Sequence, residues 1–352
     1  MARTWTPEDA AAAREERLQE FGERMQRAVD ELVTGDDWIG AIAFAAKFRS
    51  RSFLNTMAIW VQHQDAYAKG LVPNPEPTYV AGFKQWQQLD RRVMKGQPGY
   101  MILAPVIGNF ASSDPQSGEW RRLAPRERPA DGETVSHRLV GVKPAYVWDS
   151  SQTDGPGQVP VRPMPKLLEG EAPEGLWDAL ALRVADLGYA LGDVPDASEI
   201  RGANGMTDYA AKRVEVRQDM DDAARVKTLA HELGHILLTD PANPDASHHR
   251  GISEVEAESF AAMVCVCFGM DSTGYTIPYV AGWSETVKDK TPLEVMQSTG
   301  ERVRKAVLAE FDHLPSPSID DGAPPSLSNE YSIDPAEVEP VGVAASRETV
   351  GL

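Results

Sequence analysis

Apolar residues recur with helical spacing between positions 226 and 238. They follow the i, i+3, i+4, i+7 pattern of one helix face: Val226, Leu229, Ala230, Leu233, Ile236 and Leu237. An aspartate just upstream, Asp221 or Asp222, can cap the start of this helix, where an acid also suits the helix dipole. Asp240 and Pro241 mark its end. The pattern therefore predicts one amphipathic helix with a buried face.

A second helix is predicted from Ile252 onward. Phe260, Val264 and Phe268 continue an apolar face, and two glutamates, Glu254 and Glu258, share another face because they are four residues apart.

The first 150 residues alternate between helical and strand-like patterns. Thr6-Pro7 begins a charged helix that reaches about Val33, and an apolar helical segment spans residues 38–64. Short strands are predicted at residues 78–82, 100–106 and 139–148, with a short helix at 83–89. Residues 111–133 are polar and irregular. We therefore expect a mixed domain of modest size.

Composition divides the chain further. Ser150 to Pro165 is rich in Pro, Gly, Gln and Ser without periodicity, which is typical of a linker. From Asp312 to the end there are eight acids and one base, which is typical of a disordered tail. We predict an α+β protein with four parts: an N-terminal domain at 1–150 with a first helix at 1–34, a linker at 151–166, a second domain at 167–312 and a disordered acidic tail at 313–352.

Three ionisable residues of the first predicted helix form an H-E-x-x-H motif: His231, Glu232 and His235. The two histidines lie one turn apart on the same side, so their imidazoles can bind one zinc ion at about 2.0–2.1 Å. Glu232 is placed to act as general base towards a water molecule on the metal. The alternative is an ordinary polar helix face, but these groups lie within the apolar run, where burial without partners is costly.

The second helix supplies a third ligand. We predict Glu254 as that ligand and Glu258 as an acceptor that holds a histidine N–H. Glu256 lies about 200° from Glu254 around the helix, so we expect it to be a solvated charge. Two histidines, one glutamate and an open fourth position describe a catalytic zinc rather than a closed structural one. One Zn²⁺ per chain is thus the expected cofactor.

Other residues could complete such a site. The alternating segment Arg213–Arg217 is either an edge strand that pairs with extended substrate backbone or a plain structural strand. An oxyanion donor is also needed, and Tyr279 is the first candidate and Tyr275 the second; both could instead be packed aromatics. His248 and His249 lie in the loop between the ligand helices and are expected to be solvated.

Charge and cysteine content limit the possible classes. The chain has 352 residues and a formal net charge of −18, which argues against a general nucleic-acid binder. Its two cysteines, Cys265 and Cys267, point to different faces of one helix and are expected to be buried thiols. Residues 1–20 contain no apolar signal region, and no run reaches the length of a membrane span. We therefore expect a cytoplasmic protein without membrane contact.

One window departs from the overall charge. Between Trp38 and Phe110 there are eight basic and three acidic residues, interleaved with aromatics and amides. Basic groups for phosphates and aromatics for base stacking are what single-stranded DNA binding requires, although the aromatics could simply be core. The candidate contacts are Lys47, Arg49, Arg51, Asn55, Lys84, Trp86, Arg91, Arg92 and Lys95.

These segments resemble a known family. Residues 254–261 resemble the E-x-x-A-[EN]-x-x-A segment of gluzincin peptidases of the ImmA/IrrE-like and ArdC types, and residues 279–283 resemble the Y-[IV]-A-x-W of the ArdC type. Residues 79–106 are similar to the ArdC N-terminal domain, as are the shorter segments 51–55 and 147–155. The resemblance covers most of residues 35–290. It implies an N-terminal domain that binds single-stranded DNA, a zincin-like metallopeptidase domain that acts on an unknown protein substrate, and a role in antirestriction or in protecting mobile DNA.

Three residues depart from the family pattern. Asp90 stands where the family often has Gly, Gln97 where it often has Glu, and Arg51 where it often has Tyr. Two alternatives remain open. One is an ImmA-like regulatory protease that cleaves a repressor without DNA binding, and the other is a non-catalytic single-strand-binding protein whose zinc is structural.

Overall fold

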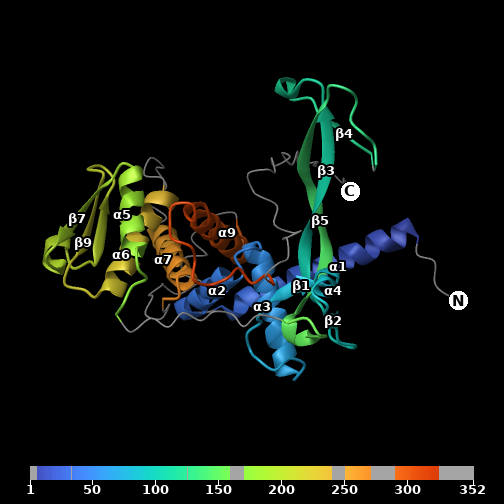
Figure 1. The fold of residues 1–352 in the computed structure, drawn as a ribbon, viewed down its shortest axis with the longest axis horizontal. Helices are drawn as coiled ribbons and strands as arrows, with labels where there is room; N and C mark the ends of the chain where they lie inside the picture. Colours follow the sequence, from blue (N-terminus) through green and yellow to red (C-terminus); the bar gives the residue numbers. More distant parts are fainter. Residues whose placement is uncertain are drawn as a thin grey trace, which may run out of the picture.

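The computed structural model describes residues 6–32, 34–124, 126–158, 170–239, 250–270 and 290–324. Figure 1 shows three regions: a small sheet with helices at one end, a central group of helices, and a long two-stranded ribbon that projects from the body. Both helices and strands are present, so the predicted α+β class is confirmed.

The chain begins with three helices: α1 (Pro7–Glu31), α2 (Gly35–Lys47) and α3 (Phe53–Ala68). The predicted helical segment 38–64 is thus two helices. The second begins anew because the Ser52 hydroxyl accepts a hydrogen bond from the Asn55 amide and caps α3. A capping box between Thr34 and Asp37 fixes the start of α2.

The ribbon is built from two long antiparallel strands, β3 (Tyr100–Ser112) and β5 (Thr134–Asp149). β1 (Val80–Gly82) pairs with β5, and β4 (Arg121–Arg122) pairs with β3, which gives the order β1-β5-β3-β4. Helix α4 (Phe83–Gln88) follows β1, and η1 (Pro115–Ser117) lies in the connection from β3 to β4. Both long strands exceed their predicted bounds, because pairing continues far beyond the residues that reach the core.

Two amides of α3 support the free edge of β3. Asn55 accepts from the Leu103 N–H and donates to the Leu103 carbonyl, at 2.9 Å each. Gln62, two turns later, makes the same two bonds to Met101 at 2.8 and 3.0 Å. These side chains therefore replace a neighbouring strand and anchor the ribbon in the body.

The predicted linker begins later than expected. Residues 150–152 form η2 (Ser150–Gln152), and β6 (Thr153–Asp154) pairs with β2 (Arg92–Val93). Arg91 donates to the carbonyls of Thr153 and Gly157. Residues 151–157 thus belong to the N-terminal region, because their backbone is held by hydrogen bonds that composition does not reveal.

The second half contains α5 (Leu176–Asp186), η3 (Ala197–Ile200), a three-stranded sheet, and the helices α6 (Asp222–Leu238), α7 (Arg250–Cys267) and α9 (Pro292–Glu310). Its strands are β7 (Ala190–Val194), β8 (Gly205–Asp208) and β9 (Arg213–Arg217), in the order β7-β9-β8. The sequence left open whether β9 is an edge strand or a plain structural strand. It is the structural strand, because β9 pairs with β7 in parallel and with β8 in antiparallel orientation.

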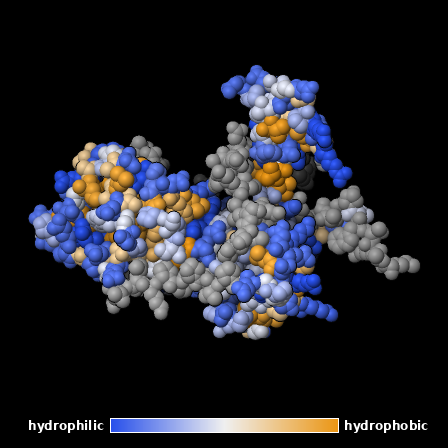
Figure 2. Space-filling view, in the orientation of Figure 1, coloured by the Kyte–Doolittle hydropathy of each residue, from blue (hydrophilic) through white to orange (hydrophobic). Residues whose placement is uncertain are grey.

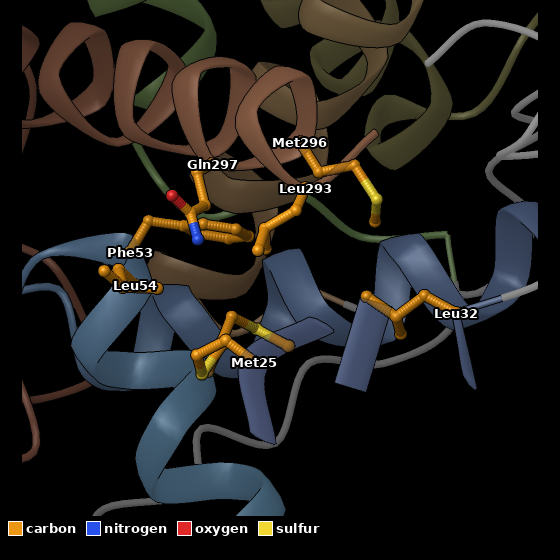
Figure 3. Close-up of a pocket in the computed structure, with 8 residues that line it drawn as sticks. Met25, Leu32, Phe53, Leu54, Leu293, Met296 and Gln297 are labelled. Atoms are coloured by element: carbon orange, nitrogen blue, oxygen red, sulfur yellow. The ribbon is translucent and has the colours of Figure 1, made fainter. Parts of the chain in front are cut away.

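One core joins the two halves. Buried residues of α2 and α3, among them Trp38 and Phe53, belong to the same apolar cluster as buried residues of α6, α7 and α9. The Trp38 indole N–H donates to the Ser259 hydroxyl of α7 at 2.8 Å, with both residues fully buried. Apolar side chains line a narrow pocket where α1, α3 and α9 meet (Figure 3), among them Met25, Met57 and Met296.

The start of the predicted disordered tail is wrong as well. Residues 313–324 are packed onto the body: the amides of Ser318 and Ile319 donate to the Cys267 carbonyl, and Val80 N–H donates to the Gly322 carbonyl. Leu314 and Ile319 are buried. These two apolar residues and the backbone bonds outweigh the acidic composition, so the chain packs against the body through Pro324. Residues 325–352 lie outside the described part.

Candidate metal centre

Helix α6 carries the H-E-x-x-H motif, as predicted from the apolar pattern. Asp221 caps it by accepting from the Ala224 amide, and it ends at Leu238 with Thr239 as the C-cap. Val226, Leu229, Ala230 and Leu233 are buried in the core. Burial of this face turns the two histidines towards α7.

Close helix packing brings Glu254 to the histidines. A Cβ atom at Gly234, inside the motif, would lie 3.0 Å from the Ala257 Cα of α7. A larger residue would therefore push the two backbones apart by a few tenths of an ångström. Ala257 itself is small and buried, which suits the same contact.

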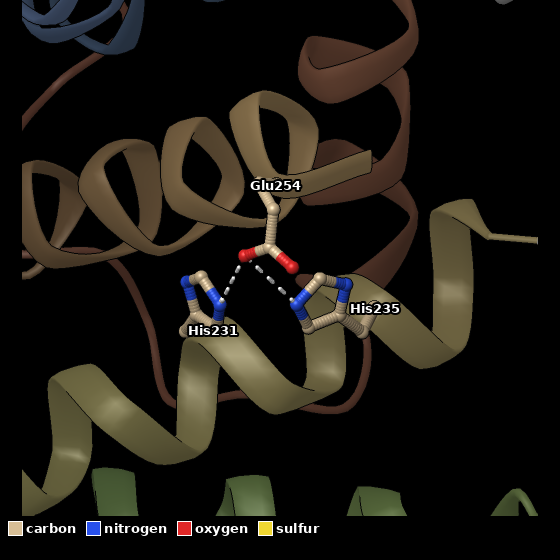
Figure 4. A group of neighbouring side chains, drawn as sticks. All are labelled: His231, His235 and Glu254. Atoms are coloured by element: carbon tan, nitrogen blue, oxygen red, sulfur yellow. Dashed lines mark ion pairs between the residues drawn. The ribbon is translucent and has the colours of Figure 1, made fainter. Parts of the chain in front are cut away.

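Three side chains converge at this crossing (Figure 4). One oxygen of Glu254, Oε2, lies 3.6 Å from Nε2 of His231 and 3.6 Å from Nε2 of His235. The donor atoms of all three lie within 4.8 Å of one another. Two atoms bound to one tetrahedral zinc ion at about 2.0–2.1 Å would be roughly 3.3 Å apart, so the spacing fits a shared divalent ion.

The electrostatics reflect this proximity. The two imidazoles, first His231 and then His235, hold the pKa of Glu254 well below its ordinary value. Burial lowers the pKa of His231, but its contacts with Glu254 and Glu258 outweigh burial and raise that pKa to about 9. The three groups are therefore strongly coupled, and the site is partly open because the Glu254 side chain remains 58% exposed.

The outer nitrogens of both histidines have partners. His231 Nδ1 lies 2.8 Å from Glu258 Oε2, which is the contact that the predicted holding role of Glu258 requires. His235 Nδ1 lies 3.5 Å from the Ser253 hydroxyl, which in turn is 2.6 Å from Thr239 Oγ1. With Nδ1 engaged, each ring presents Nε2 to the shared position.

Glu232 is buried beside the three donors and is held by β8. Thr207 Oγ1 donates to Glu232 Oε2 at 2.6 Å, and Glu232 is 4% exposed. Gly205, two residues earlier on the same strand, leaves the space: a Cβ there would lie 2.7 Å from Glu232 Oε1. Sequence reasoning missed both residues, since nothing near them marks a site 25 residues ahead of the motif.

Glu256 is not the solvated charge that the sequence suggested. It is 3% exposed, and its Oε1 lies 2.9 Å from an Arg302 nitrogen of α9. Burial raises the pKa of Glu256 to about 7, although Arg302 opposes this. Arg302 also donates to the Leu238 carbonyl at 2.7 Å. The far side of α7 thus faces another helix, which a helical wheel alone cannot show.

The predicted DNA contacts are not gathered on one surface. Arg49 is buried and donates to the carbonyls of Ile319 and Asp320, and Arg51 is buried and donates to the Val80 carbonyl. Trp86 is fully buried, with its N–H donating to the Trp148 carbonyl. These three are corrections, because the groups are engaged in the fold.

The remaining candidates divide in the same way. Asn55 holds the edge of β3, Arg91 binds β6 and the segment after it, and Lys47 pairs with Glu76 at 2.8 Å. Three basic residues of the set stay exposed: Lys84, Arg92 and Lys95. Sequence composition identified the local positive charge but could not separate structural cations from solvent-facing ones.

Four candidate residues fall outside the described part of the chain: His248, His249, Tyr275 and Tyr279. Cys265 and Cys267 are buried free thiols, as predicted. Among the described helices, none is long and apolar enough to cross a membrane.

Comparisons with known proteins place the N-terminal region. Residues 16–147 match the family described as the N-terminal domain of anti-restriction factor ArdC. An uncharacterized protein, y4eC, of Sinorhizobium fredii is 24% identical over 247 residues, which is 67% of this chain and 70% of that protein. An uncharacterized protein of Bacillus anthracis is 24% identical over 299 residues; these make up 77% of this chain but only 48% of that longer protein.

Two solved structures are also similar, both of the antirestriction ArdC protein from the R388 plasmid. The metal-free form matches with a TM-score of 0.43 and 19% identity, over 73% of this chain and 83% of that one. The Mn(II)-bound form matches with a TM-score of 0.41 and 18% identity, over 74% and 87%. The family match over residues 16–147 thus identifies this part of the chain as an ArdC-type N-terminal domain.

Proposed function

We propose that the chain is a zinc metallopeptidase of the antirestriction type whose N-terminal region binds single-stranded DNA. The observation that carries the peptidase part is the convergence of His231, His235 and Glu254 within 4.8 Å, with Glu232 buried beside them. His231, His235 and Glu254 would hold the ion. Nitrogen and carboxylate donors in this ratio fit zinc, and other divalent ions remain compatible with the donor set.

A bound zinc ion supplies Lewis acidity, which lowers the pKa of water to about 7 and polarises a carbonyl. The chain does the rest. Glu232 takes a proton from the attacking water and returns it to the leaving amine as the peptide bond breaks. Thr207 holds one oxygen of Glu232 so that the other can face the reacting water. Tyr279 is the proposed oxyanion donor, on the sequence argument alone.

The edge of the small sheet supports binding of an extended peptide. β8, which carries Thr207, pairs only with β9 among the described strands. Its other edge can therefore accept a substrate strand, the role that the sequence considered for β9. Such pairing would bring the peptide backbone directly past Glu232.

The proposal of DNA binding rests on the family match and on local charge. Residues 80–112 contain four basic residues and one acid in a chain of net charge −18. By extension from the relatives, the biological role would be antirestriction, with protection or establishment of mobile DNA. An unknown protein would be the peptidase substrate.

Two variants test the peptidase. Glu254→Gln should lose most zinc, measured by metal analysis after gel filtration, because a ligand charge is removed. Glu232→Gln should keep zinc but lose hydrolysis of a fluorescence-quenched peptide library. Glu199→Gln, an exposed glutamate in η3, is the matched control and should change neither.

The outcomes separate the alternatives. Full zinc content in Glu254→Gln would remove Glu254 from the ligand set. A wild-type chain that binds zinc but hydrolyses no peptide would favour a structural metal. Hydrolysis without binding to single- or double-stranded oligonucleotides at low salt would favour a regulatory protease in the manner of ImmA.

A further inference from the structure

Exposed apolar side chains gather on the β3–β5 ribbon. Nine large hydrophobic residues of the described part are exposed, and six of them belong to the ribbon or to α4 at its base: Phe83, Ile107, Val135, Leu139, Val142 and Tyr146. Their exposed fractions run from 37% to 47%. Figure 2 shows apolar patches along the ribbon where it stands away from the body. Exposed apolar side chains that gather on one element in this way point to an interaction site.

The strand register puts these residues on one face. Directly paired residues of an antiparallel ladder point to the same side, and every second residue of a strand does so too. The pairs Met101–Tyr146, Pro105–Val142, Ile107–Leu139 and Ala111–Val135 are all two or four residues apart along β3. The polar pair Asn109–His137 lies on the same side, between the last two of them. We call the side that carries them the apolar face of the ribbon.

A bulge makes this face continuous. Val106 pairs with Gly141 but Ile107 pairs with Leu139, so β5 contains one extra residue, Val140. In a regular strand, Leu139 and Val142 would point to opposite sides, because their positions differ by three. The extra residue therefore puts Leu139, in the outer half of the ribbon, and Val142, in the inner half, on the same apolar face.

Aromatic rings form the base of the apolar face. Trp148 pairs with Ala81 and lies two residues beyond Tyr146, on the same side of β5. The Phe83 ring packs edge-on against the Trp148 ring, with centroids 6.1 Å apart. Phe83 and Tyr146 are 47% and 41% exposed, so both offer open ring surface over a packed tryptophan.

The strands of the ribbon and the segment at its base are cationic, apart from Asp154 of β6, which is paired with Arg92. Residues 80–112 and 134–148 contain one acid, Asp90, and six basic residues: Lys84, Arg91, Arg92, Lys95, Arg138 and Lys143. Lys84 follows Phe83 directly, and the turn after Lys95 is tied to the base of the ribbon by the bond from Trp148 Nε1 to the Gln97 carbonyl. Arg138 and Lys143 project from the other side of a ribbon only two strands wide. A polyanion is thus the complementary partner.

We propose that the apolar face of the ribbon binds single-stranded nucleic acid, with bases stacked on Tyr146 and Phe83 and with phosphates near Lys84, Arg92 and Lys95. This inference rests on the proposed binding of single-stranded DNA and assigns its surface. Exposed rings and aliphatic side chains suit unpaired bases and sugars, whereas a duplex offers neither stacking faces nor apolar edges to a flat stripe. Binding of bases and sugars would explain why the apolar side chains of this face are exposed in an otherwise acidic chain.

The test uses the full chain and fluorescein-labelled oligo(dT) of about 20 nucleotides, followed by anisotropy across about 50 to 200 mM salt. The double variant Phe83→Ala with Tyr146→Ala should bind at least about tenfold more weakly, with an unchanged salt slope. Tyr67→Ala removes a ring of 44% exposure on α3, outside the apolar face, and should bind like wild type.

Replacement of three basic residues gives a second, independent test through the salt dependence of binding. The triple variant Lys84→Gln, Arg92→Gln, Lys95→Gln should lower the slope of log K against log salt by about 2, since each phosphate contact to a single strand contributes about 0.7. Lys69→Gln, at an exposed lysine at the end of α3, should leave the slope unchanged. Melting temperatures of all variants should match wild type, because every replaced side chain is exposed.

The outcomes distinguish the surface from the function. If the wild-type chain binds oligo(dT) and neither the aromatic double variant nor the charge triple variant weakens binding, the apolar face is not the binding surface. The proposed DNA binding would then still stand. Equal loss of single- and double-strand binding would overturn the single-strand assignment. A wild-type chain that binds neither form would remove the DNA-binding part of the proposed function together with this inference.

Discussion

The Trp38 indole N–H and the Ser259 hydroxyl meet at 2.8 Å although 221 residues separate them in sequence. Ser259 follows Glu258, the residue that contacts His231 Nδ1. The bond therefore links α2 of the family-matched N-terminal region to the helix that carries Glu254. Both residues are fully buried, so the bond has no water to replace it.

Trp38→Phe should destabilise the whole chain by about 1–3 kcal/mol, because it leaves the Ser259 hydroxyl buried without its donor and removes ring volume. Urea denaturation measures this. In a double-mutant cycle with Ser259→Ala, the combined loss should be smaller than the sum of the single losses. Strict additivity would mean that the bond contributes nothing.

Gly234→Ala should weaken metal binding. The added Cβ would lie 3.0 Å from the Ala257 Cα, which is backbone and cannot turn aside, so α7 must shift away from the histidines. Zinc affinity by competition with a chelator should fall at least about tenfold, as expected for loss of ligand geometry. Gly22→Ala in α1, where no atom lies within 4 Å of the added Cβ, should leave affinity unchanged and slightly stabilise the chain.

Thr207→Val should reduce peptide hydrolysis by about tenfold while zinc content stays constant, because the carboxylate of Glu232 loses a hydrogen bond worth about 1.4 kcal/mol in positioning. Valine keeps the shape of threonine, so packing is preserved. Thr207→Ser keeps the hydroxyl and should restore most of the rate. Equal rates in the valine and serine variants would show that this bond has no role in hydrolysis.

Glu256 should make stability depend on pH. The pKa of its buried carboxyl is about 7, above the unfolded value of 4.5, so the folded state holds the proton more tightly. Its unfavourable contribution is absent below about pH 4.5 and grows as pH rises through 7, reaching a few kcal/mol at most. Urea titrations at several pH values should show this decline, and Glu256→Gln should flatten it. A steeper decline in the variant would contradict the assignment.

The local parts of the fold could be predicted from sequence. Helix α6 begins and ends within a few residues of its predicted bounds, because apolar spacing and the Asp221 cap are both local signals. The convergence of His231, His235 and Glu254 could be predicted from the same helical geometry. Only the inner parts of β3 and β5 were predicted as strands. Their outer parts contact no core that would require apolar and polar residues to alternate.

What could not be predicted depends on distant partners. Arg49, Arg51 and Asn55 share the composition of a DNA-binding stretch, but their hydrogen bonds go to residues 319–320, 80 and 103. Glu256 was misassigned because its partner Arg302 lies far ahead in sequence, on another helix. The sequence could not decide whether β9 lies at an edge, because its partner β7 is separated from it by η3, β8 and a turn.

The packed segment at residues 313–324 changes how the molecule is divided. Because α7 and α9 pack into the same core as α2 and α3, and the Gly322 carbonyl accepts from Val80 N–H, the helices that carry His231, His235 and Glu254 are not a unit separate from the N-terminal helices. A gene fragment that stops at residue 150 therefore removes most of the shared core. Conversely, if the backbone is cleaved once between residues 158 and 170, the two pieces should stay associated. Cleavage of the chain would therefore not by itself separate its activities.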